Sequence, residues 1–152
     1  MQNYHIDTSG GIQTKIMVNN TLHAPLCSHV RLANGIHTFV FQESSRAAVD
    51  QWIDYMDDIL GIWSFDNPVR LSLDTRYSGA LPIVYMTLCL RDLFANYDKR
   101  PCLRIALISD QGALMILVQM LAQITSSDDQ NVVQYYQARE DVDAIQWLLE
   151  SN

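Results

Sequence analysis

The sequence predicts one α/β domain, in which helices flank a single mixed, mostly parallel sheet of roughly four to six strands. The chain has 152 residues, about the length of one typical domain. Hydrophobic residues make up 49% of it and charged residues 18%, which is enough apolar material for a full core. From residue 36 onward, strand-like and helix-like patterns alternate, and helical crossovers of this length join parallel strands. We therefore treat residues 1–152 as a single domain.

The first 42 residues predict an N-terminal arm followed by a hairpin. Residues 1–25 are polar and weakly patterned, with a possible strand at residues 12–18. Residues 30–42 predict two antiparallel strands joined by a two-residue Asn34-Gly35 turn. In that register His37 faces Leu32 and His29 faces Val40, so we expect the two histidines not to pair.

Residues 43–152 predict alternating helices and strands. Ser44 or Ser45 can cap a helix whose apolar residues, from Val49 to Trp63, recur at steps of three and four. The following elements are expected as a strand at 69–74, a helix at 80–97, a strand at 102–109, an apolar helix at 112–124, a strand at 132–136 and a last helix from residue 140.

Charge and composition narrow the function classes. The formal net charge of −7 repels polyanions, so we expect no nucleic-acid partner. Three cysteines without a C-x-x-C spacing indicate a reducing compartment. The first residues lack the cationic start and apolar run typical of a secretion signal, and no apolar run in the sequence reaches about 20 residues. We expect a cytoplasmic protein with no membrane span. Glycine-rich phosphate motifs are missing from the sequence, and the loose set His23, Cys27 and His29 does not have zinc-ligand spacing, so neither a cofactor nor a metal is expected.

Candidate site residues lie where predicted strands end, because ligands of parallel sheets bind beyond the carboxyl ends of the strands. The first set is Asp74, Arg76, Ser78 and Gly79. Ser78 is expected at the start of a helix, where the positive end of the helix dipole would stabilise a phosphate. The ordinary alternative is an N-cap serine without a switching role.

Two further sets extend this region. Asp74 and Asp110 both end predicted strands and could serve a hydrolase as paired carboxylates, or could simply cap the turns that follow them. Met115 and Met120 lie on the apolar helix 112–124, which together with helix 80–97 could line a groove for an acyl chain or a partner helix. Burial of that helix in the core is the ordinary alternative.

The order of these motifs resembles the SpoIIAA-like (STAS-like) family of small bacterial α/β proteins. The resemblance covers about residues 33–149 and rests on three segments: Leu71-Ser72-Leu73-Asp74 through Ser78-Gly79, the strand from Arg104 to Asp110, and the ending from Val142 to Leu149 with its A-x-x-W-L pattern. It implies a non-enzymatic role in bacterial signalling, with a protein partner or a small apolar ligand. Related domains are anti-sigma-factor antagonists switched by phosphorylation of a serine, which Ser78 matches, with Gly79 as the glycine that follows.

Three function hypotheses follow. The first is a non-enzymatic STAS-like regulatory or ligand-binding module. The second is a phosphorylation-dependent protein-interaction switch at Ser78, and the third is a small hydrolase that uses Asp74 and Asp110. The oligomeric state stays open, with a homodimer as one alternative.

Overall fold

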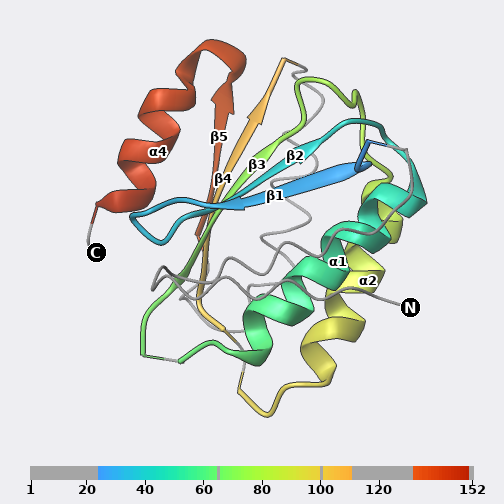
Figure 1. Cartoon of the computed structure of the whole chain (residues 1–152), viewed down its shortest axis with the longest axis vertical. Coiled ribbons are helices and arrows are strands. Elements are labelled where there is room, and N and C mark those ends of the chain that lie inside the picture. The colour runs from blue at the N-terminus through green and yellow to red at the C-terminus, as the bar shows by residue number, and fades with distance from the viewer. Residues whose placement is uncertain (1–23, 65, 100, 111–131, 151–152) are drawn as a thin grey trace, which may run out of the picture.

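The computed structural model describes residues 24–64, 66–99, 101–110 and 132–150, and in them the chain forms a five-stranded mixed sheet. The strands lie in the order of the sequence, and β1 is antiparallel to β2 while the others are parallel (Figure 1). The strands are β1 (Cys27–Arg31), β2 (His37–Phe41), β3 (Val69–Asp74), β4 (Leu103–Ser109) and β5 (Val132–Gln137). The predicted mixed, mostly parallel α/β fold is confirmed. The strand expected at 12–18 and the helix expected at 112–124 lie outside the described residues.

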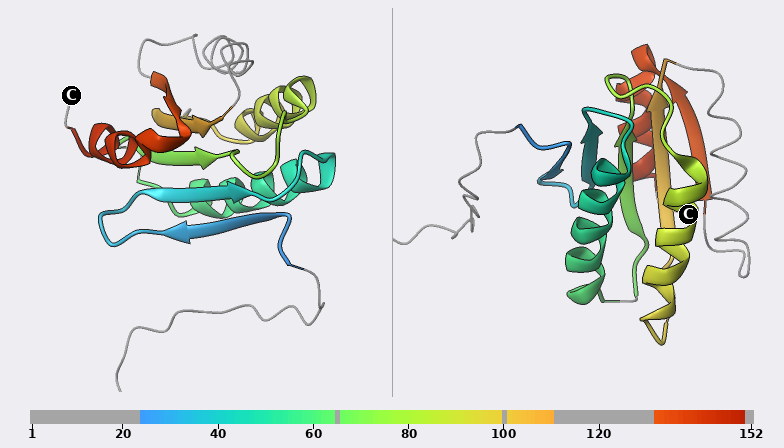
Figure 2. Two further views of the ribbon diagram at one scale, coloured as in Figure 1. Left: turned by 90° about the horizontal axis from the view of Figure 1, so that it is seen from above. Right: turned by 90° about the vertical axis from the view of Figure 1, so that its right-hand side faces the viewer.

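Helices cover both faces of the sheet. α1 (Arg46–Gly61) and α2 (Ile83–Ala95) pack side by side on one face, whereas α4 (Asp141–Leu149) lies on the other (Figure 2). A short 3-10 helix, η2 (Ala138–Glu140), leads from β5 into α4. In the described part of the chain, no helix has the length and apolar character that crossing a membrane requires.

The alternation of strand residues divides the core in two, because successive side chains of a strand point to opposite faces. The larger core lies under α1 and α2 and includes Phe39, Trp52 and Leu71. The smaller core lies under α4 and contains Ile36, Ala106, Ile108, Tyr136, Ala144 and Leu148. Two layers of helices on one central sheet therefore bury both faces of β3 and β4.

The helix α1 follows its sequence pattern closely. Ser45 is its N-cap, and the Ser45 Oγ accepts a hydrogen bond from the Ala48 N–H at 3.1 Å. The buried residues of α1 are Ala48, Val49, Trp52, Met56, Ile59 and Leu60. Their spacing of three and four residues places one continuous stripe against the sheet, as the sequence predicts.

The hairpin register differs from the predicted one by one residue. Gly35 has a φ of 84°, the Gly35 N–H bonds to the Leu32 carbonyl at 2.9 Å, and the Leu32 N–H bonds to the Ile36 carbonyl at 2.8 Å. This geometry closes a three-residue loop over residues 33–35, because a glycine in the left-handed region completes that loop type. His29 therefore faces Phe39 rather than Val40. Because Phe39 and His37 lie two residues apart on β2, His29 shares a face with His37 and the two rings contact each other. The prediction that the two histidines do not pair is wrong.

The helix α2 begins later than predicted. Its first residue is Ile83 and its N-cap is Pro82, rather than a residue near Ala80. A residue that precedes proline is disfavoured in the helical region, so Leu81 is not expected to be helical. Ser78 consequently lies in the loop after β3, and the expectation that it starts a helix is wrong.

Candidate functional site

An open cleft lies on the α4 face of the sheet, and we call it the Asp74 cleft. It has a volume of about 390 Å³. Its lining residues are Leu32, Thr38, Ser72, Asp74, Arg76, Ile108, Asp141, Val142 and Ile145. Residues of β2, β3 and β4 form its floor and residues of α4 form one wall. Leu32, the residue that follows β1, lines another side. A cleft of this size can hold a small molecule.

Strand register brings the polar floor of the cleft together. Thr38 of β2 pairs with Ser72 of β3, and Asp74 of β3 pairs with Ile108 of β4. Since residues two apart on a strand share a face, Ser72 and Asp74 both face α4. Two parallel strands, β2 and β3, thus carry two hydroxyls and one carboxylate to one place, and β4 adds the apolar Ile108 beside them.

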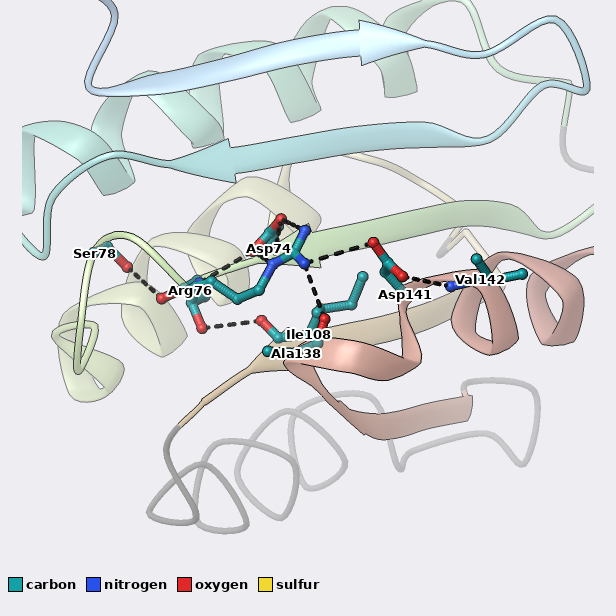
Figure 3. Close-up of polar contacts among 8 residues, drawn as sticks. Asp74, Arg76, Ser78, Ile108, Ala138, Asp141 and Val142 are labelled. Atoms are coloured by element: carbon teal, nitrogen blue, oxygen red, sulfur yellow. Dashed lines mark hydrogen bonds and ion pairs between the residues drawn. The ribbon is translucent and has the colours of Figure 1, made fainter.

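Asp74 is held by Arg76 through four hydrogen bonds. The Arg76 backbone N–H donates to Asp74 Oδ1 at 3.0 Å, and the Arg76 side chain donates from Nε to both carboxylate oxygens, at 3.0 and 3.1 Å. Arg76 Nη2 completes the set with a contact of 2.6 Å to Oδ2 (Figure 3). Asp74 is only 4% exposed, so this carboxylate is buried with its charge compensated. Through the bond from the Arg76 backbone N–H, Asp74 caps the turn that follows β3, which is the ordinary role expected from the sequence as the alternative to catalysis.

Arg76 also connects the end of β3 to α4. Its Nη1 donates to the Ala138 carbonyl at 2.9 Å and lies 3.5 Å from Asp141 Oδ2. The hydrogen bond with Asp74 raises the pKa of the Arg76 guanidinium above its usual range. Burial opposes this rise, and the charges of Asp74 and Asp141 each add a smaller increase. Arg76 therefore stays charged and joins two segments that are 62 residues apart in sequence.

Two buried hydroxyls at the cleft have no hydrogen-bond partner among the described residues. They are Thr38 Oγ1 and Ser72 Oγ, and Ser72 as a whole is 1% exposed. A buried hydroxyl without a partner costs about 1–3 kcal/mol relative to one that is satisfied. A ligand that enters the cleft can supply hydrogen bonds that these two groups lack.

Sequence reasoning missed these two hydroxyls, although a signal for them was present. Arg70, Ser72 and Asp74 alternate with the apolar residues of β3, and Thr38 occupies an equivalent position in β2. That pattern places Ser72 on the same face as Asp74. It does not show that the face is a cleft, since α4 comes from a segment far along the chain.

The structure separates some of the predicted site residues from the cleft. The Ser78 Oγ lies 3.3 Å from the Thr75 carbonyl and 3.2 Å from the Gly79 carbonyl. Its hydrogen bonds are therefore made within the loop that follows β3. Gly79 has a φ of 74°, a conformation that glycine adopts without strain. Neither residue is among those that line the Asp74 cleft.

Asp110 lies at a second cleft, which is lined by Ser109, Asp110, Tyr135, Gln137, Ala138 and Arg139. The structure therefore does not gather Asp74 and Asp110 around one cleft. Met115 and Met120 lie outside the described residues, and so does the groove expected beside them.

The paired histidines form a separate cluster on the opposite face of the sheet. His29 Nε2 and His37 Nδ1 are 3.0 Å apart, and the His29 ring stacks on Phe39 with centroids 4.7 Å apart. Burial lowers the pKa of His37 to about 4, with further lowering by the charges of His29 and Arg31, and burial also lowers the pKa of His29. Both rings are therefore neutral at pH 7. Within the described ranges, no three His, Cys, Asp or Glu residues are grouped so that they could hold a metal ion.

Comparisons with known proteins add no relative to this picture: no family model, no curated protein and no solved structure matches the chain.

Proposed function

We propose that this protein is a non-enzymatic regulatory or ligand-binding module and that the Asp74 cleft is its binding site. The observation that carries the proposal is the buried Ser72 hydroxyl, which has no partner and lies at a cleft with apolar walls. Folding has left this buried group unsatisfied beneath a cleft that a small molecule can enter. The resemblance to SpoIIAA-like proteins of bacterial signalling supports the same class of function.

The state of Asp74 supports binding rather than catalysis. A catalytic carboxylate must accept a proton, attack a substrate or hold a metal ion. The four bonds that Asp74 accepts from described residues all come from Arg76, so any of these roles would require a buried ion pair to break. The hydrolase hypothesis also needs Asp110 nearby, and Asp110 lines a different cleft.

The same ion pair provides a route from binding to regulation. Arg76 contacts both Ala138 and Asp141, where β5 gives way to α4. A ligand that rests against Arg76 and Val142 would therefore favour one position of α4 over others, and with it one position of the exposed Leu149 on that helix. The Ser78 switch has less support, because the Ser78 hydroxyl is engaged by the loop and lies outside the cleft.

Obstruction of the cleft tests this proposal. Val142 lines the cleft and is 73% exposed, so Val142→Trp should fill the mouth of the cleft without disturbing the core. Leu149→Trp is the matched control, since Leu149 lies two helical turns further along α4, is also exposed, and does not line the cleft.

The assay is a two-dimensional NMR titration of the full chain with a panel of small amphipathic compounds. We expect compounds that shift the amide signals of Thr38, Ser72 and Ile108 in the wild type and in Leu149→Trp, and not in Val142→Trp. Binding that is equal in both variants would place the site elsewhere and contradict the proposal.

A further inference from the structure

We infer that the Asp74 cleft selects an uncharged amphipathic molecule, with a hydroxyl or amide group on an apolar body, and rejects anions. This inference rests on the proposed function and names the chemical class of its ligand. Three features of the cleft carry it: the balance of its charges, its unpartnered hydroxyls and its apolar walls.

The charges that line the cleft already have partners and are negative in sum. Among the described residues of the lining, one base, Arg76, faces two acids, Asp74 and Asp141, which gives these residues a net charge of −1. The Arg76 Nε and Nη2 groups donate to Asp74, while Nη1 faces Ala138 and Asp141. A carboxylate or phosphate would have to displace a buried partner and add charge to a negative site. The guanidinium is therefore a structural group here rather than an anion receptor.

The unpartnered hydroxyls call for a group that can both donate and accept. Each hydroxyl offers one donor and two acceptor positions, and Thr38 and Ser72 are opposite each other on paired strands. A ligand hydroxyl or amide can donate to one of them and accept from the other. An ether or a carbonyl can only accept.

Side-chain rotation gives a ligand access to the Thr38 hydroxyl, beside which Ser72 lies on the paired strand. Thr38 is partly exposed although its Oγ1 is buried, so other atoms of the side chain face outward. Rotation about χ1 exchanges the methyl and hydroxyl groups of Thr38 between staggered positions. A bound hydroxyl or amide would stabilise the rotated state by the hydrogen bonds that it makes.

The remaining walls are apolar and need an apolar ligand body. Leu32, Ile108 and Ile145 line the cleft beside Val142, which is largely exposed. A compact hydrocarbon body would cover Val142 and remove apolar surface from water.

A matched pair of probes tests the inference: cyclohexylmethanol, which is neutral, and cyclohexanecarboxylate, which has the same ring and an anionic group. Each is titrated at pH 7 into the full chain and followed by two-dimensional NMR. We expect the alcohol to shift the amides of Thr38, Ser72 and Val142 and to bind at least about tenfold more tightly than the carboxylate, a ratio that corresponds to the loss of one good polar contact.

Two variants identify the groups responsible. The double variant Thr38→Val with Ser72→Ala should weaken alcohol binding by about tenfold or more. Thr87→Val is the control, because Thr87 Oγ1 is likewise buried without a partner among the described residues, yet lies on α2 away from the cleft. This control should bind the alcohol as the wild type does.

The outcomes separate the ligand class from the site. Equal or tighter binding of the carboxylate at the cleft residues would overturn the ligand class and leave the cleft as the binding site. Unchanged alcohol affinity in the double variant would overturn the role of the hydroxyls. Failure of both probes to shift any cleft residue would overturn this inference together with the binding role of the cleft.

Discussion

Removal of the Ser72 hydroxyl should stabilise the unliganded protein. The change Ser72→Ala deletes one oxygen from a residue that is 1% exposed and whose Oγ has no partner among the described residues. The unfolded chain satisfies this hydroxyl with water, so its burial opposes folding. Removal of the group relieves that cost and keeps the Cβ packing.

The magnitude follows from the cost of an unsatisfied buried hydroxyl, about 1–3 kcal/mol. Removal of the oxygen also takes away some van der Waals contact, so we expect the free energy of unfolding to rise by about 1 kcal/mol. For a chain of this size that rise corresponds to an increase of about 2–4 °C in Tm. Thr38→Val, which removes the other cleft hydroxyl, should act in the same direction.

The assay is urea denaturation followed by circular dichroism, with thermal unfolding as a second measure. Thr87→Val provides a comparison at a buried hydroxyl outside the cleft. If Ser72→Ala raises the free energy of unfolding and also weakens ligand binding, the Ser72 hydroxyl lowers stability while it contributes to binding. A loss of 1 kcal/mol or more would show that the hydroxyl is satisfied in the folded protein, and the reasoning from unpartnered groups would fail.

Three further predictions follow from the ion pair, the paired histidines and the loop. Arg76→Ala should lower the free energy of unfolding by about 3 kcal/mol, because it leaves the buried Asp74 charge without a partner, whereas Arg91→Ala at an exposed pair should change it by less than about 1 kcal/mol in the same urea titration. Stability should be full above pH 6.5 and fall toward pH 4 by up to about 3 kcal/mol, because burial lowers the folded-state pKa of His37 to about 4 and the unfolded chain takes up the proton first. Urea curves at pH 7, 5.5 and 4 measure this decline, and an unchanged decline in His37→Leu would assign it to other groups. Ser78→Glu should cost about 1 kcal/mol by loss of the loop hydrogen bonds and leave ligand affinity in the NMR titration unchanged, whereas altered partner capture by this variant would favour the phosphorylation switch.

Local patterns predicted most of the elements but not their register. The Asn34-Gly35 pair marked the hairpin, and the alternation in β2 marked its two faces. The loop nevertheless has three residues, since Gly35 alone takes the left-handed conformation. A shift of one residue moves every side chain of a strand to the other face, which is why His29 and His37 meet against expectation.

The start of α2 likewise could not be read from the apolar pattern of the sequence. The apolar stripe predicted α2, and it contains the buried residues Met86, Leu90, Leu93 and Phe94. The stripe does not show where the helix starts, and the restriction that proline places on the preceding residue delays the start to Ile83. That delay removes the helix N-terminus from Ser78 and with it the phosphate site that the sequence suggested.

The sequence by itself determined the α/β class, the alternation of strands with helices, and the position of Asp74 and Arg76 at a strand end, because periodicity and turn residues act within a few positions of the chain. Only the tertiary structure decided that Arg76 would span from Asp74 to Ala138 and that α4 would leave a cleft over Ser72. These contacts join segments more than 60 residues apart, and no local pattern encodes which distant group will occupy the space beside a strand.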